Sequence, residues 1–581
     1  MMKPVKHIFL ALSFTLFVVS VILFSFKDTH HSADFEYRND TLLPQASLSF
    51  SAVPGFYSKD FELEILAPSN EIYYTLDGTD PDKSSIRYTE PIMISDATNQ
   101  PNVHSARIDT SAGYLDLPGA NVYTTPDYLI DKCTIIRAAY YDQHGNRSPI
   151  KTGTYFVGFD EKAAYDNIHV LSVITDPDHL FDRQNGIYIL GDVYDNYVHR
   201  GKDWWWWDAN YHQSGREWER PATIQLFNSE QEIVLTQDVG VRIQGGGSRG
   251  YCQKSLNLYA RDEYAGNTKI HYDFWNTGYL PERLTVSICG DDYKTKIKDR
   301  LGSELLSGLH LSTMHYLPCL MFLDGEFWGL YYITEKYDPA YIQHTYHVDA
   351  DNAVFVKNGS LDFGLEEDLT AFVDMKNYMT WADLSLDEKY QEAWTYLDKE
   401  SMLDYLASMI YISRIGDFRF AGHNSQLWRS RKPGTSPYAD CKWRWTIFDL
   451  NSERGGIDKG NTDHDTIDYT RIANPMVNRL FDNKQFREDI ARRIIDFGLN
   501  RFSKERVNQK IDSYLEELND CYAIHKKRFG ISDAEFQKEL DHIRYFFEHR
   551  YDYVITMLKN HFPELDIDAM HAEAVAAHTA H

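Results

Sequence analysis

The chain has 581 residues, and its 59 Lys and Arg against 86 Asp and Glu give a formal net charge of −27. This acidity excludes a general nucleic-acid binder, because such proteins need basic surface to displace the counterions of the phosphate backbone. A composition of 43% hydrophobic and 25% charged residues is that of a globular protein, and the length predicts two to four domains. The six cysteines form no CxxC pair, which argues against a thiolate zinc site.

An apolar run without charged residues, 8–26, follows Lys3 and Lys6 near the start of the chain. About 20 apolar residues span a bilayer, and the preceding positive charges place the start of the chain in the cytoplasm. A cleaved signal peptide is the alternative. The residues after the run lack the small-x-small cleavage pattern, so an uncleaved anchor over 1–27 is favoured. In both cases the body of the protein is predicted to be exported, behind a polar linker at 28–48.

Short alternating segments with glycine- and proline-containing turns predict an antiparallel β-sandwich over 49–158. The stretches IYYTLDGTDPDKSS (72–85) and TIIRAAYYDQHGNRSPIKTGTYFV (134–157) resemble the small β-sandwich module at the ends of chitobiases and β-hexosaminidases. An insertion near 96–132 interrupts the resemblance. It implies an accessory domain without catalytic residues, and it leaves glycan contact open as a role for the sandwich.

The larger segment that follows contains four consecutive tryptophans, Trp204–Trp207. They predict either a platform for a carbohydrate or other ring ligand, or a flap that packs on the domain.

A glycine-rich turn then separates two alternating segments, 239–244 and 255–258. Residues 246–250 fit the G-x-S-x-G nucleophile elbow, but that motif needs a helix after the serine, and the pattern here is that of a strand. A glycine-rich hairpin lets backbone N–H groups approach a polyphosphate, and Lys254 on the return strand can pair with the phosphates. A solvated strand lysine is the alternative. The loop residues expected to contact a nucleotide are Gly245, Gly246, Gly247, Ser248 and Arg249.

Acidic and amide side chains suited to phosphoryl transfer come later in the chain. Asp449 follows a predicted strand, 443–448, and Asp417 and Asn424 lie upstream in a predicted helical half. Carboxylate and amide oxygens are ligands that Mg²⁺ accepts, and a carboxylate near the acceptor hydroxyl is needed for the transfer. Asp417 and Asn424 are seven residues apart, not five as in the protein-kinase catalytic loop. On spacing alone, helix caps or surface residues are an equal alternative.

Taken together, these pieces resemble the CotH (spore coat protein H) family of atypical protein kinases. The matching segments, in the family's order over about 159–560, are LFDRQNGIYILG, REWERPATIQLF, VGVRIQGGGSR…QKSLNLYARDEYAG, FLDGEFWGLYYITEKYD, GDFRFAGHN and IFDLN. The resemblance implies an α+β fold with an atypical kinase-like two-lobed domain that binds ATP and Mg²⁺ or Mn²⁺ in its cleft. Lys254 is similar to the family's phosphate-binding lysine, and Asp417 to its catalytic aspartate.

The resemblance also assigns the remaining site residues. Asp449 resembles the metal-binding aspartate, and Asn424 and Asn451 would contribute further metal ligands. Asn451 stands where the family usually has aspartate, and a basic insertion, RSRKPGTSPYADCK, lies between Asp417 and Asp449. Glu335 resembles an acid kept in the family, either as part of the cleft or as a nucleotide contact.

The sequence therefore predicts an exported, membrane-anchored kinase that transfers the ATP γ-phosphate to Ser or Thr hydroxyls of surface or envelope proteins. One alternative is a non-catalytic surface protein that binds a glycan or a partner on a kinase-like fold. Another is a carbohydrate-active hydrolase, for which no convincing carboxylate pair is present. The expected organisation is an anchor at 1–27, a linker at 28–48, the sandwich at 49–158, the kinase-like domain at 159–562 and a frayed tail at 563–581.

Overall fold

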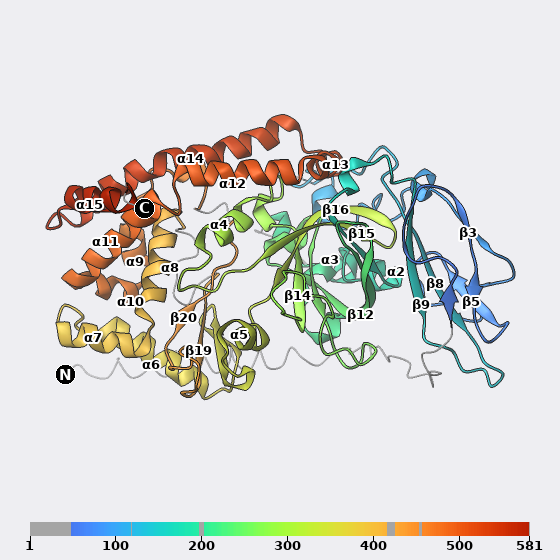
Figure 1. The fold of residues 1–581 in the computed structure, drawn as a ribbon, viewed down its shortest axis with the longest axis horizontal. Coiled ribbons are helices and arrows are strands. Elements are labelled where there is room, and N and C mark those ends of the chain that lie inside the picture. The colour runs from blue at the N-terminus through green and yellow to red at the C-terminus, as the bar shows by residue number, and fades with distance from the viewer. Residues whose placement is uncertain (1–47, 118, 197–202, 415–423, 452–455, 580–581) are drawn as a thin grey trace, which may run out of the picture.

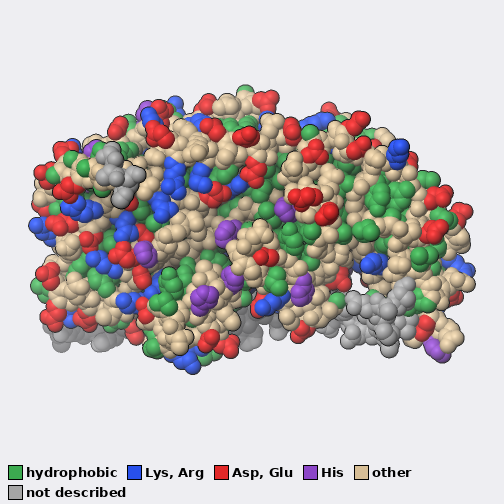
Figure 2. All heavy atoms as spheres, in the orientation of Figure 1, with side chains coloured by type: hydrophobic (Ala, Val, Ile, Leu, Met, Phe, Trp, Pro, Cys, Tyr) green, Lys and Arg blue, Asp and Glu red, His purple; other side chains and the backbone are tan. Residues whose placement is uncertain are grey.

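The computed structural model describes residues 48–579, except 118, 197–202, 415–423 and 452–455. Along the long axis of the molecule, a β-rich module is followed by a barrel and then by a mainly helical part (Figure 1). The predicted anchor lies outside the described residues. Within them, no helix is both long enough and apolar enough to cross a bilayer. Acidic side chains are spread over the whole visible face, with Lys and Arg between them (Figure 2).

The N-terminal module is built around one five-stranded sheet. Its strands in spatial order are β2 (Gly55–Tyr57), β9 (Lys151–Val157), β8 (Thr134–Tyr140), β5 (Ile72–Thr75) and β6 (Ile86–Arg87). Two short antiparallel pairs complete it: β1 (Ser49–Phe50) with β4 (Ile65–Leu66), and β3 (Phe61–Leu63) with β7 (Ile92–Ile94). The buried side chains of Leu63, Ile136 and Tyr155 pack between these layers, as the alternating sequence predicts.

The insertion near 96–132 binds the module to the barrel. The carboxylate of Glu326, at the start of β16, accepts backbone N–H groups from Val103 and, at 2.7 Å, from Ser105. Phe156 of β9 also packs against Phe322 of the barrel with ring centroids 5.0 Å apart. The two parts are therefore joined by hydrogen bonds to Glu326 and by packing of aromatic rings.

Seven strands form a closed barrel. In spatial order they are β10 (His169–Ile174), β11 (Arg220–Phe227), β12 (Ile233–Gln244), β13 (Ser255–Tyr259), β14 (Arg283–Ser287), β16 (Glu326–Glu335) and β15 (Tyr316–Leu323). All neighbours are antiparallel except β10 and β15, whose parallel pairing closes the barrel. Alternate residues, such as Leu256 and Leu258 of β13, fill one buried core. Asp324 and Gly325 form the two-residue turn between β15 and β16, and both have the positive φ of a type I′ turn.

Short helices surround the barrel. They are α2 (Pro177–Phe181), α3 (Gly191–Asp195), the 3-10 turn η4 (Trp204–Trp206) and α4 (Lys298–Leu306). The chain leaves the barrel through α5 (Pro339–Tyr346) into a second sheet. This sheet has the order β18 (Ser360–Phe363), β17 (Ala353–Lys357), β19 (Gln426–Ser430) and β20 (Arg444–Trp445). Beside it lie α6 (Asp368–Trp381), α7 (Asp387–Tyr396) and α8 (Lys399–Tyr411).

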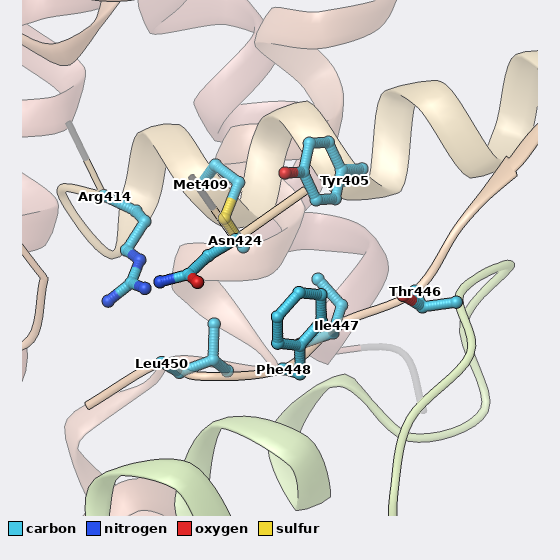
Figure 3. A pocket seen from close by; sticks show the side chains of 8 residues that line it. All are labelled: Tyr405, Met409, Arg414, Asn424, Thr446, Ile447, Phe448 and Leu450. Carbon is cyan, nitrogen blue, oxygen red and sulfur yellow. The ribbon is translucent and has the colours of Figure 1, made fainter. Parts of the chain in front are cut away.

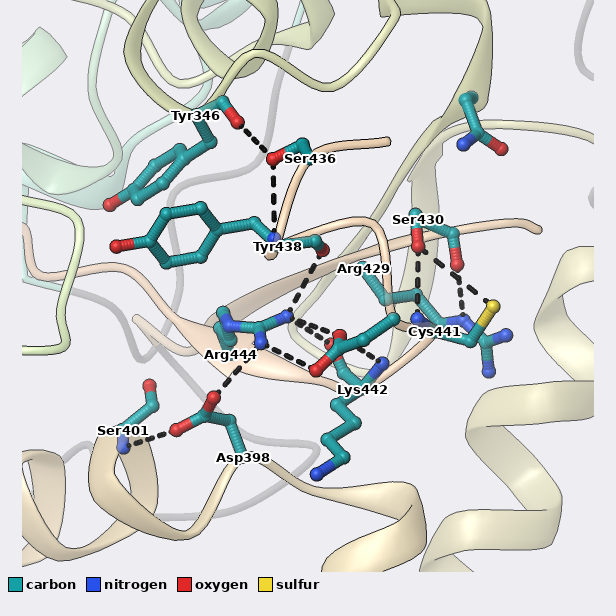
Figure 4. Close-up of polar contacts among 12 residues, drawn as sticks. Tyr346, Asp398, Ser401, Arg429, Ser430, Ser436, Tyr438, Cys441, Lys442 and Arg444 are labelled. Atoms are coloured by element: carbon teal, nitrogen blue, oxygen red, sulfur yellow. Dashed lines mark hydrogen bonds and ion pairs between the residues drawn. The ribbon is translucent and has the colours of Figure 1, made fainter. Parts of the chain in front are cut away.

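The basic insertion between β19 and β20 is an ordered loop (Figure 4). Arg444 donates to Asp398, at the start of α8, at 2.9 Å and to Asp440 of the loop at 2.8 Å. Ser436 Oγ donates to the Tyr346 carbonyl at 2.6 Å. The insertion thus ties the second sheet to α5 and α8, and it leaves the strand leading to Asp449 in place.

The C-terminal part is helical, as predicted. It comprises α9 (Thr466–Ala473), α10 (Pro475–Asn478), α11 (Lys484–Leu499), α12 (Lys504–Glu517), α13 (Asn519–Phe529), α14 (Asp533–His561) and α15 (Ile567–Thr579). The expectation of a frayed tail at 563–581 is wrong over α15, because Ile567 and Met570 are buried against the core. The fully buried Arg550 of α14 donates to the carbonyls of Tyr411 and His464, at the ends of two segments that lead toward the site described below.

Candidate active site

Asp449 and Asn424 meet at the edge of the second sheet. Asn424 lies two residues before β19, and Asp449 lies four residues after β20. The strand predicted at 443–448 is therefore shorter than expected. The Asn424 amide Nδ2 donates to Asp449 Oδ2. Both residues have a φ of 57°, in the left-handed region that asparagine and aspartate tolerate better than most residues. The Asp449 side chain is 42% exposed and is therefore accessible to a ligand.

Arg414 holds Asp449 from the other side. Its guanidinium donates to the Asp449 carbonyl, and its Nη2 lies 3.9 Å from Asp449 Oδ2. Arg414 is buried, so this positive charge has little screening by water. Asp417 itself lies outside the described residues. The two described residues that bound its segment, Arg414 and Asn424, both contact Asp449.

Asp299, on α4, is a second carboxyl group that the sequence interpretation missed. Its Oδ1 accepts the Leu450 N–H at 2.6 Å, and its Oδ2 accepts Asn451 Nδ2 at 2.7 Å. Burial and the nearby negative charge of Asp449 raise the pKa of Asp299 to about 8. No motif marks this residue, because α4 is separated from Asp449 by about 150 residues of chain. Asp299 therefore orients the turn after Asp449.

Asn451 is buried in the same turn. Its Nδ2 donates to the Cys289 carbonyl as well as to Asp299. These bonds fix the amide plane and leave Oδ1 as the atom that can face a cation. The predicted metal residues Asn424, Asp449 and Asn451 therefore belong to one polar cluster with Asp299.

A small pocket adjoins this cluster (Figure 3). Its lining is mainly apolar, with Arg414 and Asn424 facing each other at one end and Thr446 at the other. The residues that line it are Tyr405, Met409, Arg414, Asn424, Thr446, Ile447, Phe448 and Leu450.

The glycine-rich loop between β12 and β13 is a hairpin, as predicted, and the tryptophan segment covers it. A Cβ on Gly250 would lie 2.7 Å from Trp205 Cα, and one on Gly247 would lie 2.9 Å from Trp205 Cδ1. Only glycine permits this approach. Of the two interpretations of Trp204–Trp207, the structure shows the packed flap.

Lys254 and Arg249 are bound to backbone carbonyls of this loop and, for Arg249, of Gln213 beside it. Lys254 directly precedes β13, and its Nζ donates to the carbonyls of Arg249 at 2.7 Å and Tyr251 at 2.6 Å. The ammonium lies 4.0 Å from the centroid of the Tyr211 ring, and burial lowers the pKa of Lys254 well below its usual range. Arg249 donates to the carbonyls of Gly245 and Gln213, each at 2.7 Å. None of the described contacts brings Lys254 to Asp449.

The loop nevertheless lies near the polar cluster of Asn424, Asp449, Asn451 and Asp299, with one turn, 288–292, between them. Tyr251 OH donates to Asp291 Oδ1 at 2.9 Å, and the Cys289 carbonyl in the same turn accepts Asn451 Nδ2.

Glu335 ends β16 and is buried. It accepts the His315 backbone N–H at 2.6 Å and bonds the His315 ring, and this hydrogen bond raises the pKa of His315. Glu335 therefore shapes the barrel end near the cluster and makes no described contact with Asp449.

Asp458, Glu539 and His542 form another group of possible metal ligands, where the segment after 456 meets α14. His542 Nδ1 lies 3.2 Å from Asp458 Oδ2, and Glu539 pairs with Lys294 at 3.2 Å. The His542 hydrogen bond and the Lys294 ion pair satisfy the group without a cation.

Comparison with known families agrees with this architecture. Residues 241–554 match the family described as CotH kinase protein, and residues 61–155 match the family described as Fn3 associated. No curated protein matches the chain. The first match covers more than half of the chain and contains every predicted site residue from Gly245 to Asn451.

Proposed function

Because this chain belongs to the CotH kinase protein family, we propose that it is an atypical kinase. It transfers the γ-phosphate of ATP to Ser or Thr hydroxyls of surface or envelope proteins. Residues 1–27 anchor it in the membrane, and the body of the protein lies outside the cytoplasm.

The Asp449 cluster is the observation that carries this proposal. An accessible carboxylate, two amide side chains and a buried carboxyl whose pKa is raised to about 8 lie together in the matched region. These oxygen atoms fit a divalent cation, because oxygen atoms are the ligands that Mg²⁺ and Mn²⁺ prefer. Asp449 would hold the ion, with Asn424 and Asn451 offering amide oxygens. A bound ion would neutralise charge on the transferring phosphoryl group.

The surrounding residues prepare Asp449 for this role. Arg414 and Asp299 fix the turn from both sides, so that the Asp449 carboxylate needs little reorganisation when a ligand arrives. Asp417 is assigned, by the family resemblance, to accept the proton of the attacking hydroxyl.

The test is transfer of the labelled γ-phosphate by the purified full chain to itself or to a Ser/Thr-rich protein, with Mg²⁺ or Mn²⁺. Asp449→Ala should lower the rate at least about 100-fold, because the ion and the charge it neutralises are lost. Asp512→Ala, which removes an exposed carboxylate on α12, is the matched control and should keep wild-type activity. Equal turnover by Asp449→Ala would refute the kinase proposal.

One observation favours the second candidate, a non-catalytic surface protein. The glycine-rich loop is covered by Trp205, and Lys254 is bound to carbonyls within it. A protein of this kind should show no stabilisation by ATP with Mg²⁺, whereas a nucleotide-binding cleft should raise Tm in their presence.

A further inference from the structure

Three cationic side chains gather where the barrel faces the second sheet. Arg283 begins β14, Lys336 follows β16 directly, and Lys357 ends β17. The pairing of β14 with β16 sets Leu284 opposite Glu335, so that Arg283 and Lys336 are neighbours across the two strands. The Arg283 guanidinium also lies 4.4 Å from the centroid of the Phe363 ring of β18, the strand that pairs with β17. Burial, followed by the positive charges of Arg283 and Lys357, lowers the pKa of Lys336 to about 7.

In this group, which we call the cation cluster, three positive charges face the two nearby carboxylates of Asp338 and Asp362. Arg283 pairs with Asp338 at 2.7 Å, yet its buried Nη2 has no hydrogen-bond partner among the described residues. Lys336 Nζ donates to the neutral Asn257 Oδ1 at 3.2 Å. The exposed Lys357 lies over the Phe448 ring, 4.8 Å from its centroid. No described carboxylate is within ion-pair distance of either lysine.

Two connections place the cation cluster beside the candidate metal residues. Tyr337, next to Lys336, donates its OH to the Ile447 carbonyl at 2.7 Å, two residues before Asp449. Asn358, next to Lys357, donates its N–H to the Ser425 carbonyl at 2.7 Å, one residue after Asn424.

A buried charge without a partner lowers the stability of the fold, and an apolar side chain would serve a purely structural role better. A polyanion bound against the cation cluster would compensate its positive charges. An arginine fork can bind phosphate oxygens in bidentate fashion, and lysines act as point charges beside it. Lys254 and Arg249 offer less, because their donors already bond backbone carbonyls.

We propose that Arg283, Lys336 and Lys357 bind the phosphate chain of the nucleotide. They would thus have the role that the sequence assigned to Lys254 and the glycine-rich loop. As a nucleotide site this inference rests on the proposed kinase function. As a polyphosphate site it can be tested separately.

The experiment measures binding of inorganic tripolyphosphate and of ATP with Mg²⁺ to the full chain by calorimetry. Lys336→Gln should weaken tripolyphosphate binding at least about tenfold, a loss of about 1.4 kcal/mol. Lys357→Gln should weaken it by a smaller factor, and because this lysine is exposed the variant should fold normally. Lys432→Gln, at another exposed lysine two residues after β19, is the matched control and should bind as wild type does. Adenosine binding should not change in any of them.

The possible outcomes separate this inference from the proposed function. If wild type binds no tripolyphosphate, or if Lys336→Gln and Lys357→Gln bind it with wild-type affinity, the inference is wrong. If both variants transfer phosphate with the same ATP affinity as wild type, the inference is also wrong, while the kinase proposal stands. Loss of tripolyphosphate binding in the variants, with no phosphate transfer by wild type, would support the site and refute the kinase.

Discussion

At the scale of single residues, Asp299 shows how a carboxyl group outside any motif can control the site. It accepts hydrogen bonds from Leu450 and Asn451, and burial together with the charge of Asp449 raises its pKa. A proton on Asp299 lets the turn keep both hydrogen bonds without placing two negative charges side by side.

This arrangement predicts a pH dependence of stability in metal-free solution. The unfolded chain holds Asp299 near pKa ~4, and the fold raises it to about 8, so the folded state binds the proton more tightly. The stability contributed by this group is full below about pH 4 and is lost as the pH rises through about 8. Asp299→Asn should flatten the fall in the free energy of unfolding over this range in urea titrations.

Asp512→Asn, at an exposed position, serves as its control and should keep the wild-type slope. An unchanged slope in Asp299→Asn would show that another group dominates this pH range.

At the scale of elements, the glycine-rich hairpin and the tryptophan segment behave as one unit. Gly250 and Gly247 allow Trp205 to approach the loop backbone, and Arg249 and Lys254 then tie the loop internally. The local rigidity of the loop therefore depends on packing against η4 as much as on glycine itself.

Gly250→Ala should break this contact, because the new Cβ meets backbone atoms of Trp205 that have little room to move. Overpacking of this kind costs about 1–3 kcal/mol, which would appear as a lower urea midpoint and a red-shifted tryptophan emission. Gly55→Ala, where the nearest atom to a Cβ is 3.9 Å away, should change neither measurement by much. A wild-type midpoint for Gly250→Ala would mean that the flap is not packed in solution.

The hairpins and the order of β-rich and helical parts could be predicted from sequence, because alternation and turn residues such as Asp324-Gly325 are local signals. The cluster of Asn424, Asp449 and Asn451 was also predicted, through the family resemblance. Asp299 and the cation cluster could not be found this way, since α4, β14, β16 and β17 bring distant residues together only in the fold. The carbonyl partners of Lys254 could not be predicted either. Alternation shows on which face of a strand a side chain lies, but not which other residues cover that face.

At the scale of the whole molecule, the β module is joined to the barrel through buried contacts. Glu326 is buried and accepts the N–H groups of Val103 and Ser105 from the insertion, and Phe156 packs on Phe322. The module and the barrel should therefore unfold together.

Calorimetry of the full chain should accordingly show one transition that includes the β module. Glu326→Ala should lower its temperature and speed hydrogen exchange at residues 103–105, because each buried N–H left without an acceptor costs about 1–3 kcal/mol. Glu505→Ala, at an exposed position on α12, should do neither. A separate early transition of the module in wild type would contradict the shared core.

The closure of the barrel has a consequence for self-association. A strand with an unpaired edge is a template for pairing with another chain, and a closed barrel presents none. In the described part of the molecule, open sheet edges belong to β2 and β6 of the five-stranded sheet, to the pairs β1–β4 and β3–β7, and to β18 and β20 of the second sheet. The longest of these strands is β18, with four residues. Aggregation of a partly unfolded chain should therefore begin at β18, and the barrel should resist it for as long as β10 and β15 stay paired.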